Sequence, residues 1–194
     1  MDLRDKNVVV VGLARSGVGA ANLLSRMGAR VTVTDMKPRE TLAGPLGGLA
    51  REVRAVLGEH PTELFISADL IIVSPGVPLE IRPIKAAREK KVPVIGELEL
   101  AYRVLSDSAP RSRGAGGQDG RTSSALNAGN RFLAVTGSNG KSTTTTLLDM
   151  MVRESGYGTI LGGNIGRALS EEILSSPGGA DFVVAEVSSF QLEG

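Results

Sequence analysis

The chain has 194 residues, of which 41% are hydrophobic, 22% are charged and none is cysteine. This length fits one large domain or two small ones, and the lack of cysteine excludes disulfides and cysteine-ligated metals. The net charge of +1 and the aromatic content of 3% argue against binding to nucleic acid. The first apolar run, Val8–Leu13, is too short for a signal peptide or a membrane span, so we expect a cytoplasmic protein without membrane insertion.

The first 105 residues alternate between short apolar runs and helical patterns. NVVVVGL is a β-branched run typical of a buried parallel strand, and the segments after it complete a βαβ unit. Residues 36–62 show no clear pattern. The alternation predicts a Rossmann-like domain over 1–105 with a parallel, helix-covered sheet. The predicted strands are 7–13, 29–35, 70–73 and 92–96, and the predicted helices are 16–28, 80–91 and 97–105.

The helix expected at 97–105 carries Leu98, Ala101, Tyr102 and Leu105 at helical spacing, so we expect these four side chains on one buried face. The composition then changes. Residues 106–130 are mostly Ser, Gly, Ala and Arg, with Leu126 as the one large apolar residue. Such a segment buries too little to order itself, and it is interpreted as a flexible linker.

Residues 131–194 return to an α/β pattern and predict part of a P-loop-type ATPase domain. A strand at 131–137 leads into a helix that begins near Lys141 and ends by Gly156. The pairs Leu147–Met151 and Leu148–Val152 stand at i, i+4 in this helix. A strand and glycine loop at 157–166, a helix at 167–174 and a buried strand that ends at Glu186 follow.

The stretch VTGSNGKSTTTT combines two glycines, a lysine and hydroxyl residues at the start of the last long helix. A standard P-loop places its first glycine six residues before the lysine, whereas Gly137 lies four before Lys141, so the motif is a shortened variant. Gly137 and Gly140 permit a tight turn whose N–H groups face one cavity. Lys141 suits the outer phosphates of a nucleotide, and the Ser142 hydroxyl suits Mg²⁺. A capped glycine turn is the alternative.

Glu186 supports the phosphate interpretation. It ends the apolar run FVVA, which we expect to pair beside the strand that precedes the glycine loop. A carboxylate at that place can bind Mg²⁺, although a lone glutamate at a strand end is more often a solvated charge.

A second glycine loop, GLARSG, follows the first strand, with Gly12, Gly17 and then Gly19. Ala14 stands where the dinucleotide-binding pattern has a glycine, so a simple tight turn is an alternative. Asp35, about 20 residues on, is placed where a ribose-binding acid belongs in a nicotinamide site. His60 lies in an unpatterned polar stretch; we expect it to be exposed and assign it no role.

Taken together, these segments resemble the Mur ligases, the ATP-dependent amino-acid-adding enzymes of peptidoglycan synthesis. The glycine loop TGSNGKSTTT is similar to the ATP loop of that family, and GGNIG and EVSSFQLE are similar to two further signatures. The segments GLARSG, VTVTD, SPGVP and VIGELEL resemble the uridine-nucleotide domain. The resemblance covers nearly the whole chain except 106–130. Two positions depart from it: Ser138 replaces a more usual Thr, and Met36-Lys37 follow Asp35 where a uridine-contacting pair is expected.

The resemblance implies a reaction and a set of site residues. ATP would phosphorylate the carboxylate of UDP-N-acetylmuramoyl-L-alanine, and the amine of D-glutamate would displace the phosphate. Lys141 and Glu186 are the implied catalytic residues, and Ser142 and Glu186 the implied Mg²⁺ ligands. The implied ATP-binding residues are Gly137, Ser138, Asn139, Gly140, Lys141, Ser142 and Thr143. The implied UDP-substrate residues are Leu13, Ala14, Arg15, Ser16, Asp35, Ser74, Pro75, Gly76 and Asn164.

Two alternatives stay open at this point. One is another ligase of the Mur and folylpolyglutamate superfamily, although folate enzymes begin with the ATPase domain. The other is a non-catalytic or nicotinamide-dependent Rossmann module, suggested by Gly12 and Asp35. We further expect a monomer, and we expect that these 194 residues are an inactive N-terminal part of a ligase.

Overall fold

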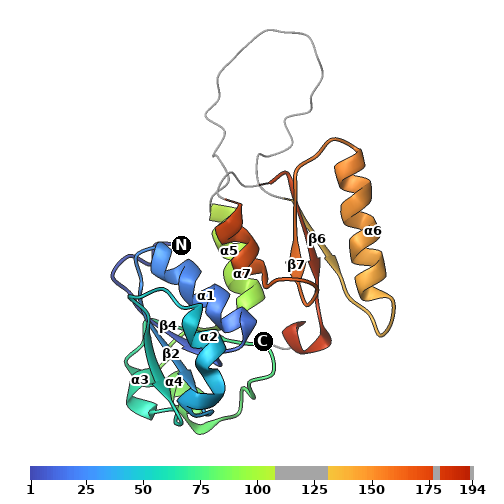
Figure 1. The fold of residues 1–194 in the computed structure, drawn as a ribbon. Coiled ribbons are helices and arrows are strands. Elements are labelled where there is room, and N and C mark those ends of the chain that lie inside the picture. The colour runs from blue at the N-terminus through green and yellow to red at the C-terminus, as the bar shows by residue number, and fades with distance from the viewer. Residues whose placement is uncertain (108–130, 177–179, 193–194) are drawn as a thin grey trace.

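The computed structural model describes residues 1–107, 131–176 and 180–192 (Figure 1). They form two parallel sheets, each flanked by helices. The strands are β1 (Asn7–Val11), β2 (Arg30–Asp35), β3 (Arg54–Leu57), β4 (Leu70–Val73), β5 (Val94–Gly96), β6 (Arg131–Val135), β7 (Thr159–Gly163) and β8 (Phe182–Glu186). The helices are α1 (Arg15–Arg26), α2 (Ala43–Gly47), α3 (Thr62–Ile66), α4 (Arg82–Glu89), α5 (Glu97–Asp107), α6 (Lys141–Glu154) and α7 (Leu169–Ser175), with short 3-10 turns at Arg39–Leu42 and Ser189–Leu192 (η2).

The N-terminal sheet has five parallel strands in the order β3-β2-β1-β4-β5. Alternate residues of β1 serve two separate cores. Val8 and Val10 pack with α1 and α5, whereas Val9 and Val11 pack with α3 and α4. A strand covered on both faces needs apolar residues at every position, which explains the unbroken run of valines. The predicted Rossmann-like sheet is therefore confirmed.

The C-terminal sheet has three parallel strands in the order β6-β8-β7. β8 lies between the other two, and its register pairs Val135 with Glu186 on one side and Gly163 with Glu186 on the other. The expected adjacency of the Glu186 strand and the glycine-loop strand is thus present. Figure 1 shows α6 on the outer side of this sheet and α7 on the side of the N-terminal sheet, where it contacts α1 and α5.

Most predicted elements appear within a few residues of their expected ends. The unpatterned stretch 36–62 contains the elements that pattern analysis missed, including β3, whose residues are only half-buried. The helix α5 continues to Asp107, two residues into the segment interpreted as a linker. The remainder of that segment, 108–130, lies outside the described residues.

The expected face of α5 is confirmed only in part. Ala101 and Leu105 are buried, together with Glu97, Leu100 and Val104, whereas Tyr102 is 48% exposed. Tyr102 instead lies edge-on against Phe132, with ring centroids 5.2 Å apart. The contact with β6, which no local pattern reveals, decides its position.

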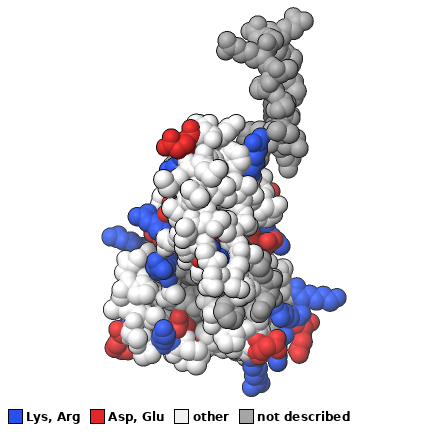
Figure 2. All heavy atoms as spheres, turned by 90° about the vertical axis from the view of Figure 1, so that its right-hand side faces the viewer, with Lys and Arg blue, Asp and Glu red and all other residues white. Residues whose placement is uncertain are grey.

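In α6 the apolar pattern does not mark a buried face. Leu147, Met150 and Met151 are all more than half exposed, and the buried residues are Thr145 and Asp149. Asp149 accepts hydrogen bonds from Arg153 Nε at 2.8 Å and from Thr159 Oγ1 at 2.5 Å, so it joins α6 to β7. Figure 2, seen from the side of α6, shows a middle area with few charged side chains.

No helix in the described part of the chain is long and apolar enough to cross a membrane.

The N-terminal core makes a direct stability prediction. Leu24 of α1 is fully buried among the β1 and β2 valines, so Leu24→Ala should lower the free energy of unfolding by about 2–5 kcal/mol. Urea denaturation followed by circular dichroism measures the change. Leu147→Ala is the matched control, because Leu147 is 55% exposed, and it should cost well under half as much. Equal losses in the two variants would contradict the described core.

Candidate functional site

The loops that follow parallel strands collect at the carboxyl edge of each sheet, and the predicted site residues lie in these loops. Leu13 to Ser16 follow β1, Asp35 ends β2, and Ser74 to Gly76 follow β4. In the C-terminal sheet, the glycine loop follows β6, Asn164 follows β7, and Glu186 ends β8. Carboxyl edges of open α/β sheets are where such folds bind ligands.

Asp35 organises the loop after β1. Its Oδ2 accepts the N–H of Leu13 at 2.7 Å, and its Oδ1 accepts the N–H of Lys37 at 2.9 Å. Each carboxylate oxygen therefore accepts a backbone N–H, one from the loop after β1 and one from the segment after β2. The acid that was predicted to contact a ligand also shapes the loop that would surround that ligand.

The same loop approaches α1 and β4 closely. A Cβ at Gly17 would collide with the carbonyl oxygen of Gly12, so only glycine permits this turn into α1. Ser74 is buried, and its Oγ donates to the carbonyl oxygen of Gly12 at 3.0 Å. Ala14 stands at the N-cap of α1 and, among the described residues, no side chain caps the helix there. The first N–H groups of α1 are thus available to an anion.

The glycine loop after β6 ends in α6. Gly140 is its N-cap, with φ of 76°, a left-handed conformation that glycine adopts without steric cost. No side chain of the described chain caps α6 at this position. The Lys141 ammonium folds back over the loop and donates to the carbonyl oxygens of Gly137 at 2.7 Å and Ser138 at 3.4 Å. The loop therefore places backbone N–H groups and one cation around the same turn, which suits a phosphate.

Glu186 is a buried carboxylate at the centre of the C-terminal sheet edge, only 2% exposed. Its Oε1 accepts the Nδ2–H of Asn164 at 2.9 Å, and the N–H of Asn164 donates to the Glu186 carbonyl oxygen at 2.9 Å. Its Oε2 is buried and has no hydrogen-bond partner within the described residues. A buried carboxylate oxygen without a partner is costly, and a bound cation would satisfy it.

The donor set fits Mg²⁺ better than a softer metal. The described residues contain no cluster of three or more His, Cys, Asp or Glu side chains. Glu186 Oε2 and the Ser142 hydroxyl are oxygen donors, and Mg²⁺ is typically held by one or two such protein ligands together with phosphate oxygens. These two residues would hold the ion.

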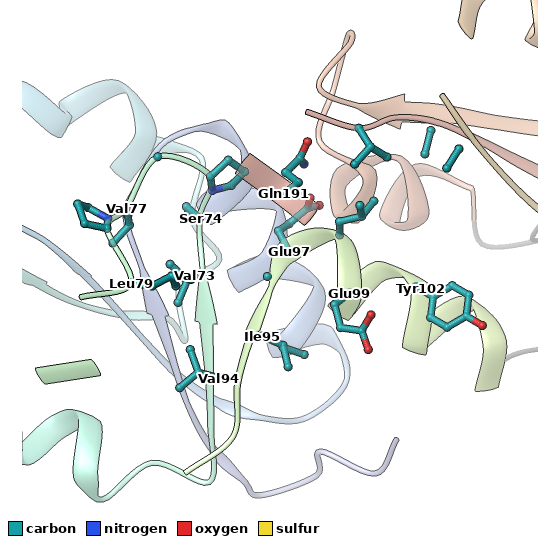
Figure 3. A pocket seen from close by; sticks show the side chains of 18 of the residues that line it. Val73, Ser74, Val77, Leu79, Val94, Ile95, Glu97, Glu99, Tyr102 and Gln191 are labelled. Carbon is teal, nitrogen blue, oxygen red and sulfur yellow. The ribbon is translucent and has the colours of Figure 1, made fainter. Parts of the chain in front are cut away.

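A cavity of about 720 Å³ lies between the two sheets (Figure 3). Ser74 and its neighbours line it from the loop after β4, Glu97 and Tyr102 from α5, and Gln191 from η2. Ser74, Pro75 and Gly76 are the predicted site residues that border it, whereas Leu13 to Ser16, Asp35, Lys141 and Glu186 do not. The predicted residues thus form two groups, one on the N-terminal edge and one on the C-terminal edge.

A hydrogen bond between two of their loops links the two groups. Arg15 Nη1 donates to the carbonyl oxygen of Gly166 at 3.0 Å, which ties the loop after β1 to the loop that carries Asn164. Asn164, predicted to contact the UDP substrate, therefore lies at the junction of the two groups. Neither hydrophobic period nor loop composition reveals this contact.

His60 is not the exposed residue that we expected. It is half-buried, and its ring lies edge-on to Phe65 at 5.9 Å. Thr34 Oγ1 donates to the Glu59 carbonyl oxygen at 2.8 Å, so Nδ1 of His60, 2.9 Å from the same oxygen, is the donor in their hydrogen bond. Burial lowers the pKa of His60, and the charge of Asp35 opposes this shift. His60 thus supports the end of β2 as a neutral imidazole.

The chain is similar to several known proteins. Residues 6–96 match the family model of the Mur ligase MurD-like N-terminal domain. The whole chain is 44% identical to a UDP-N-acetylmuramoylalanine–D-glutamate ligase of Geotalea uraniireducens and 45% identical to one of Anaeromyxobacter dehalogenans. The chain spans 38% and 37% of the length of these two relatives, respectively.

Solved structures of lower similarity also match. The UDP-N-acetylmuramate-alanine ligase MurC of Thermotoga maritima is 17% identical, with a TM-score of 0.49, over 94% of this chain and 37% of that one. A UDP-N-acetylmuramate:L-alanyl-gamma-D-glutamyl-meso-diaminopimelate ligase of Neisseria meningitides is 16% identical, with a TM-score of 0.49, over 96% and 55%.

The role of Asp35 in the loop is open to direct test. Asp35→Ala removes both acceptors for the Leu13 and Lys37 N–H groups and should lower the free energy of unfolding by about 1–3 kcal/mol. Urea denaturation measures it. Asp2→Ala is the control, because Asp2 accepts one exposed N–H, that of Arg4, and should change stability by less than about 0.5 kcal/mol. An Asp35→Ala variant as stable as the control would show that the carboxylate does not hold the loop.

Proposed function

We propose, from the match of residues 6–96 to the Mur ligase MurD-like N-terminal domain family, that the protein is an ATP-dependent ligase that adds D-glutamate to UDP-N-acetylmuramoyl-L-alanine. The product is a precursor of peptidoglycan, and the reaction belongs in the cytoplasm. The relatives that bear this name are much longer than the chain, so the activity is that of the whole protein.

One observation carries the proposal. The parallel pairing of β6 with β8 sets Glu186 opposite Val135, immediately before the loop that contains Lys141. A cationic side chain, helix N–H groups that no described side chain caps, and a buried carboxylate whose Oε2 has no hydrogen-bond partner among the described residues therefore meet at one sheet edge. This combination is the one that binding of a nucleoside triphosphate with Mg²⁺ requires.

The reaction needs a phosphate because a carboxylate is a poor electrophile. In the proposed first step a carboxylate oxygen of the UDP substrate attacks the γ-phosphorus of ATP, and ADP leaves. In the second step the amine of D-glutamate attacks the carbonyl carbon of the acyl phosphate. The C–N bond forms, a proton is lost from nitrogen, and inorganic phosphate leaves.

The residues of the glycine loop would serve the first step. The attacking carboxylate and the triphosphate are both anions, and their approach must be screened. Gly137 to Thr143 would surround the phosphates with N–H groups, and Lys141 would exchange its bonds to Gly137 and Ser138 for bonds to phosphate oxygens. When bound between Ser142 and Glu186, Mg²⁺ would neutralise charge on the phosphate oxygens. Asn164 would hold Glu186 in place.

The N-terminal edge would bind the UDP part of the substrate. The uncapped start of α1 at Ala14, Arg15 and Ser16 offers N–H groups to the diphosphate. Leu13 and Asp35 are joined by a hydrogen bond, and Ser74 to Gly76 flank the same loop from β4. We propose domain limits of 1–105 and 131–194 around the segment 106–130, and a monomeric protein.

The nicotinamide alternative is weaker than this proposal. It depends on Gly12 and Asp35, and Asp35 fits the proposed UDP site as well. It also gives no use to Lys141 or to the buried Glu186.

Removal of the Lys141 ammonium should strongly reduce ligation without affecting binding of the UDP substrate. In the full-length protein, Lys141→Ala should lower kcat by at least about 100-fold, because the charge on the transferred phosphoryl group is no longer screened. The Kd for UDP-N-acetylmuramoyl-L-alanine should stay unchanged, as measured by calorimetry. Lys90→Ala, an exposed lysine after α4, is the control and should retain full activity. Near-normal turnover of Lys141→Ala would rule out the phosphate role of this loop.

Glu186 should control the metal dependence. Glu186→Gln keeps the size of the side chain and an oxygen for Asn164 but removes the charge. In the full-length protein the Mg²⁺ concentration for half-maximal activity should rise by about 10–100-fold. Binding of ATP without metal should change much less. Glu154→Gln, at the exposed end of α6, should leave the Mg²⁺ titration unaltered. An identical titration for Glu186→Gln would remove Glu186 from the metal site.

A further inference from the structure

Glu97 is a buried charge that the proposed reaction does not use. It is the first residue of α5, directly after β5, and is 2% exposed. Its Oε1 accepts the N–H of Ser170 at 2.7 Å. Burial raises the pKa of the Glu97 carboxyl, and the hydrogen bonds from Ser170 oppose this shift. A buried carboxylate persists only where its partners offset the loss of water, so the contact with Ser170 has a structural purpose.

The bond between Glu97 and Ser170 joins the two sheets. Glu97 belongs to the N-terminal sheet and its helices, whereas Ser170 lies in α7, which follows β7 of the C-terminal sheet. Figure 1 shows α7 beside α5 and close to α1, apart from α6 on the other side of its own sheet. The helix α7 thus packs against the N-terminal region, as Phe132 of β6 also does.

Gly19 makes this close packing possible. A Cβ at Gly19 would stand 2.7 Å from Ser170 Oγ, closer than real Cβ atoms approach, and 3.2 Å from the N of Glu171, which is a tight contact. Glycine is unfavourable inside a helix such as α1, so its presence there needs a reason. The close approach of α7 supplies that reason, and it explains a glycine that the motif analysis grouped with the nucleotide loop.

Further contacts hold α7 along its length. Arg15 and Arg26 of α1 donate to the carbonyl oxygens of Gly166 and Leu174 at 3.0 and 3.2 Å. Leu169 is fully buried with Ala101 and Leu105 of α5. The helix α7 and the loop before it therefore make polar and apolar contacts with the N-terminal region, in addition to the packing of α7 against β7.

We propose that Glu97 and Gly19 form a docking site for Ser170 of α7, and that this site fixes the orientation of the C-terminal sheet relative to the N-terminal sheet. Glu97 and Gly19 are positioning residues. The effect of this orientation on the site rests on the proposed function, because the orientation sets Asn164 and Glu186 opposite the loop that contains Arg15. The docking itself does not depend on any ligand.

The segment from Asn164 to Ser170 connects the docked helix α7 to the candidate site. Asn164 holds the Glu186 carboxylate at one end, Arg15 holds the Gly166 carbonyl in the middle, and Glu97 holds the Ser170 N–H at the other end. A shift of α7 would move all three contacts together. Loss of the Glu97 bond should therefore displace the sheet that carries the phosphate loop.

The distance between two spin labels tests the docking site in this 194-residue chain without ligand. The chain has no cysteine, so Glu89→Cys on α4 and Glu154→Cys on α6 give one label on each region. Pulsed electron resonance should give a narrow distance distribution for the parent chain. Glu97→Ala should broaden it while the circular dichroism stays unchanged. Glu97→Gln keeps an acceptor oxygen for Ser170 and should restore the narrow distribution.

Glu99→Ala is the matched control, because Glu99 lies two residues further along α5, pairs with Arg103 and is exposed. It should leave the distribution narrow. A Glu97→Ala distribution as narrow as this control would overturn the proposal, as would a Glu97→Gln distribution as broad as that of Glu97→Ala.

A second pair of variants keeps the test valid should Glu97→Ala fail to fold. Gly19→Ala should broaden the distribution, because the new Cβ meets Ser170 Oγ. Ser170→Ala alone should be tolerated, since the backbone N–H of Ser170 keeps its hydrogen bond to Glu97. The double variant Gly19→Ala/Ser170→Ala should recover much of the narrow distribution. A Gly19→Ala chain with the parent distribution and a raised melting temperature would show that α7 does not dock against α1. Because no nucleotide is present, this result is independent of the ligase proposal.

Discussion

The parallel pairing of β8 with both β6 and β7 is the constraint on which the candidate site depends. It places Glu186 level with the ends of its two neighbours, Val135 and Gly163. The glycine loop starts after the first neighbour and the Asn164 loop after the second. Each loop therefore reaches the same carboxylate. Oε2 of Glu186 has no hydrogen-bond partner among the described residues, so a positive charge beside it would be stabilising. An antiparallel β8 would send Glu186 to the opposite edge.

The same geometry in the N-terminal sheet produces a second site edge. Asp35 links the ends of β1 and β2, and Ser74 links the ends of β1 and β4. Helix starts that suit a phosphate thus occur twice, at α1 and at α6. Glu97 joins the two edges through α7, and Arg15 joins them through the loop before α7. Two binding edges held in a set orientation are what a reaction between two anionic substrates needs.

Much of this arrangement could be predicted from sequence, because its signals are local. Continuous apolar runs predict the buried strands β1, β4 and β8. Glycines followed by lysine and serine predict the loop before α6. The position of Glu186 beside that loop followed from the parallel order. What could not be predicted depends on contacts distant in sequence. β3 is short and half-buried, Tyr102 is placed by Phe132, and His60 is placed by Thr34. Glu97 is an acidic residue at the start of a helix, and only the fold brings Ser170 against it.

The C-terminal edge is expected to bind ATP and the N-terminal edge UDP. Backbone NMR of the ¹⁵N-labelled chain tests this most directly, because chemical shifts detect weak binding. Titration with ATP and Mg²⁺ should shift the amide signals of 137–143, and the Mg²⁺-dependent part of the shift should vanish in Glu186→Gln. Titration with UDP should instead shift the amides of 13–16, 35–37 and 76. ATP shifts confined to the N-terminal loops, or no saturable change at 137–143, would contradict the account.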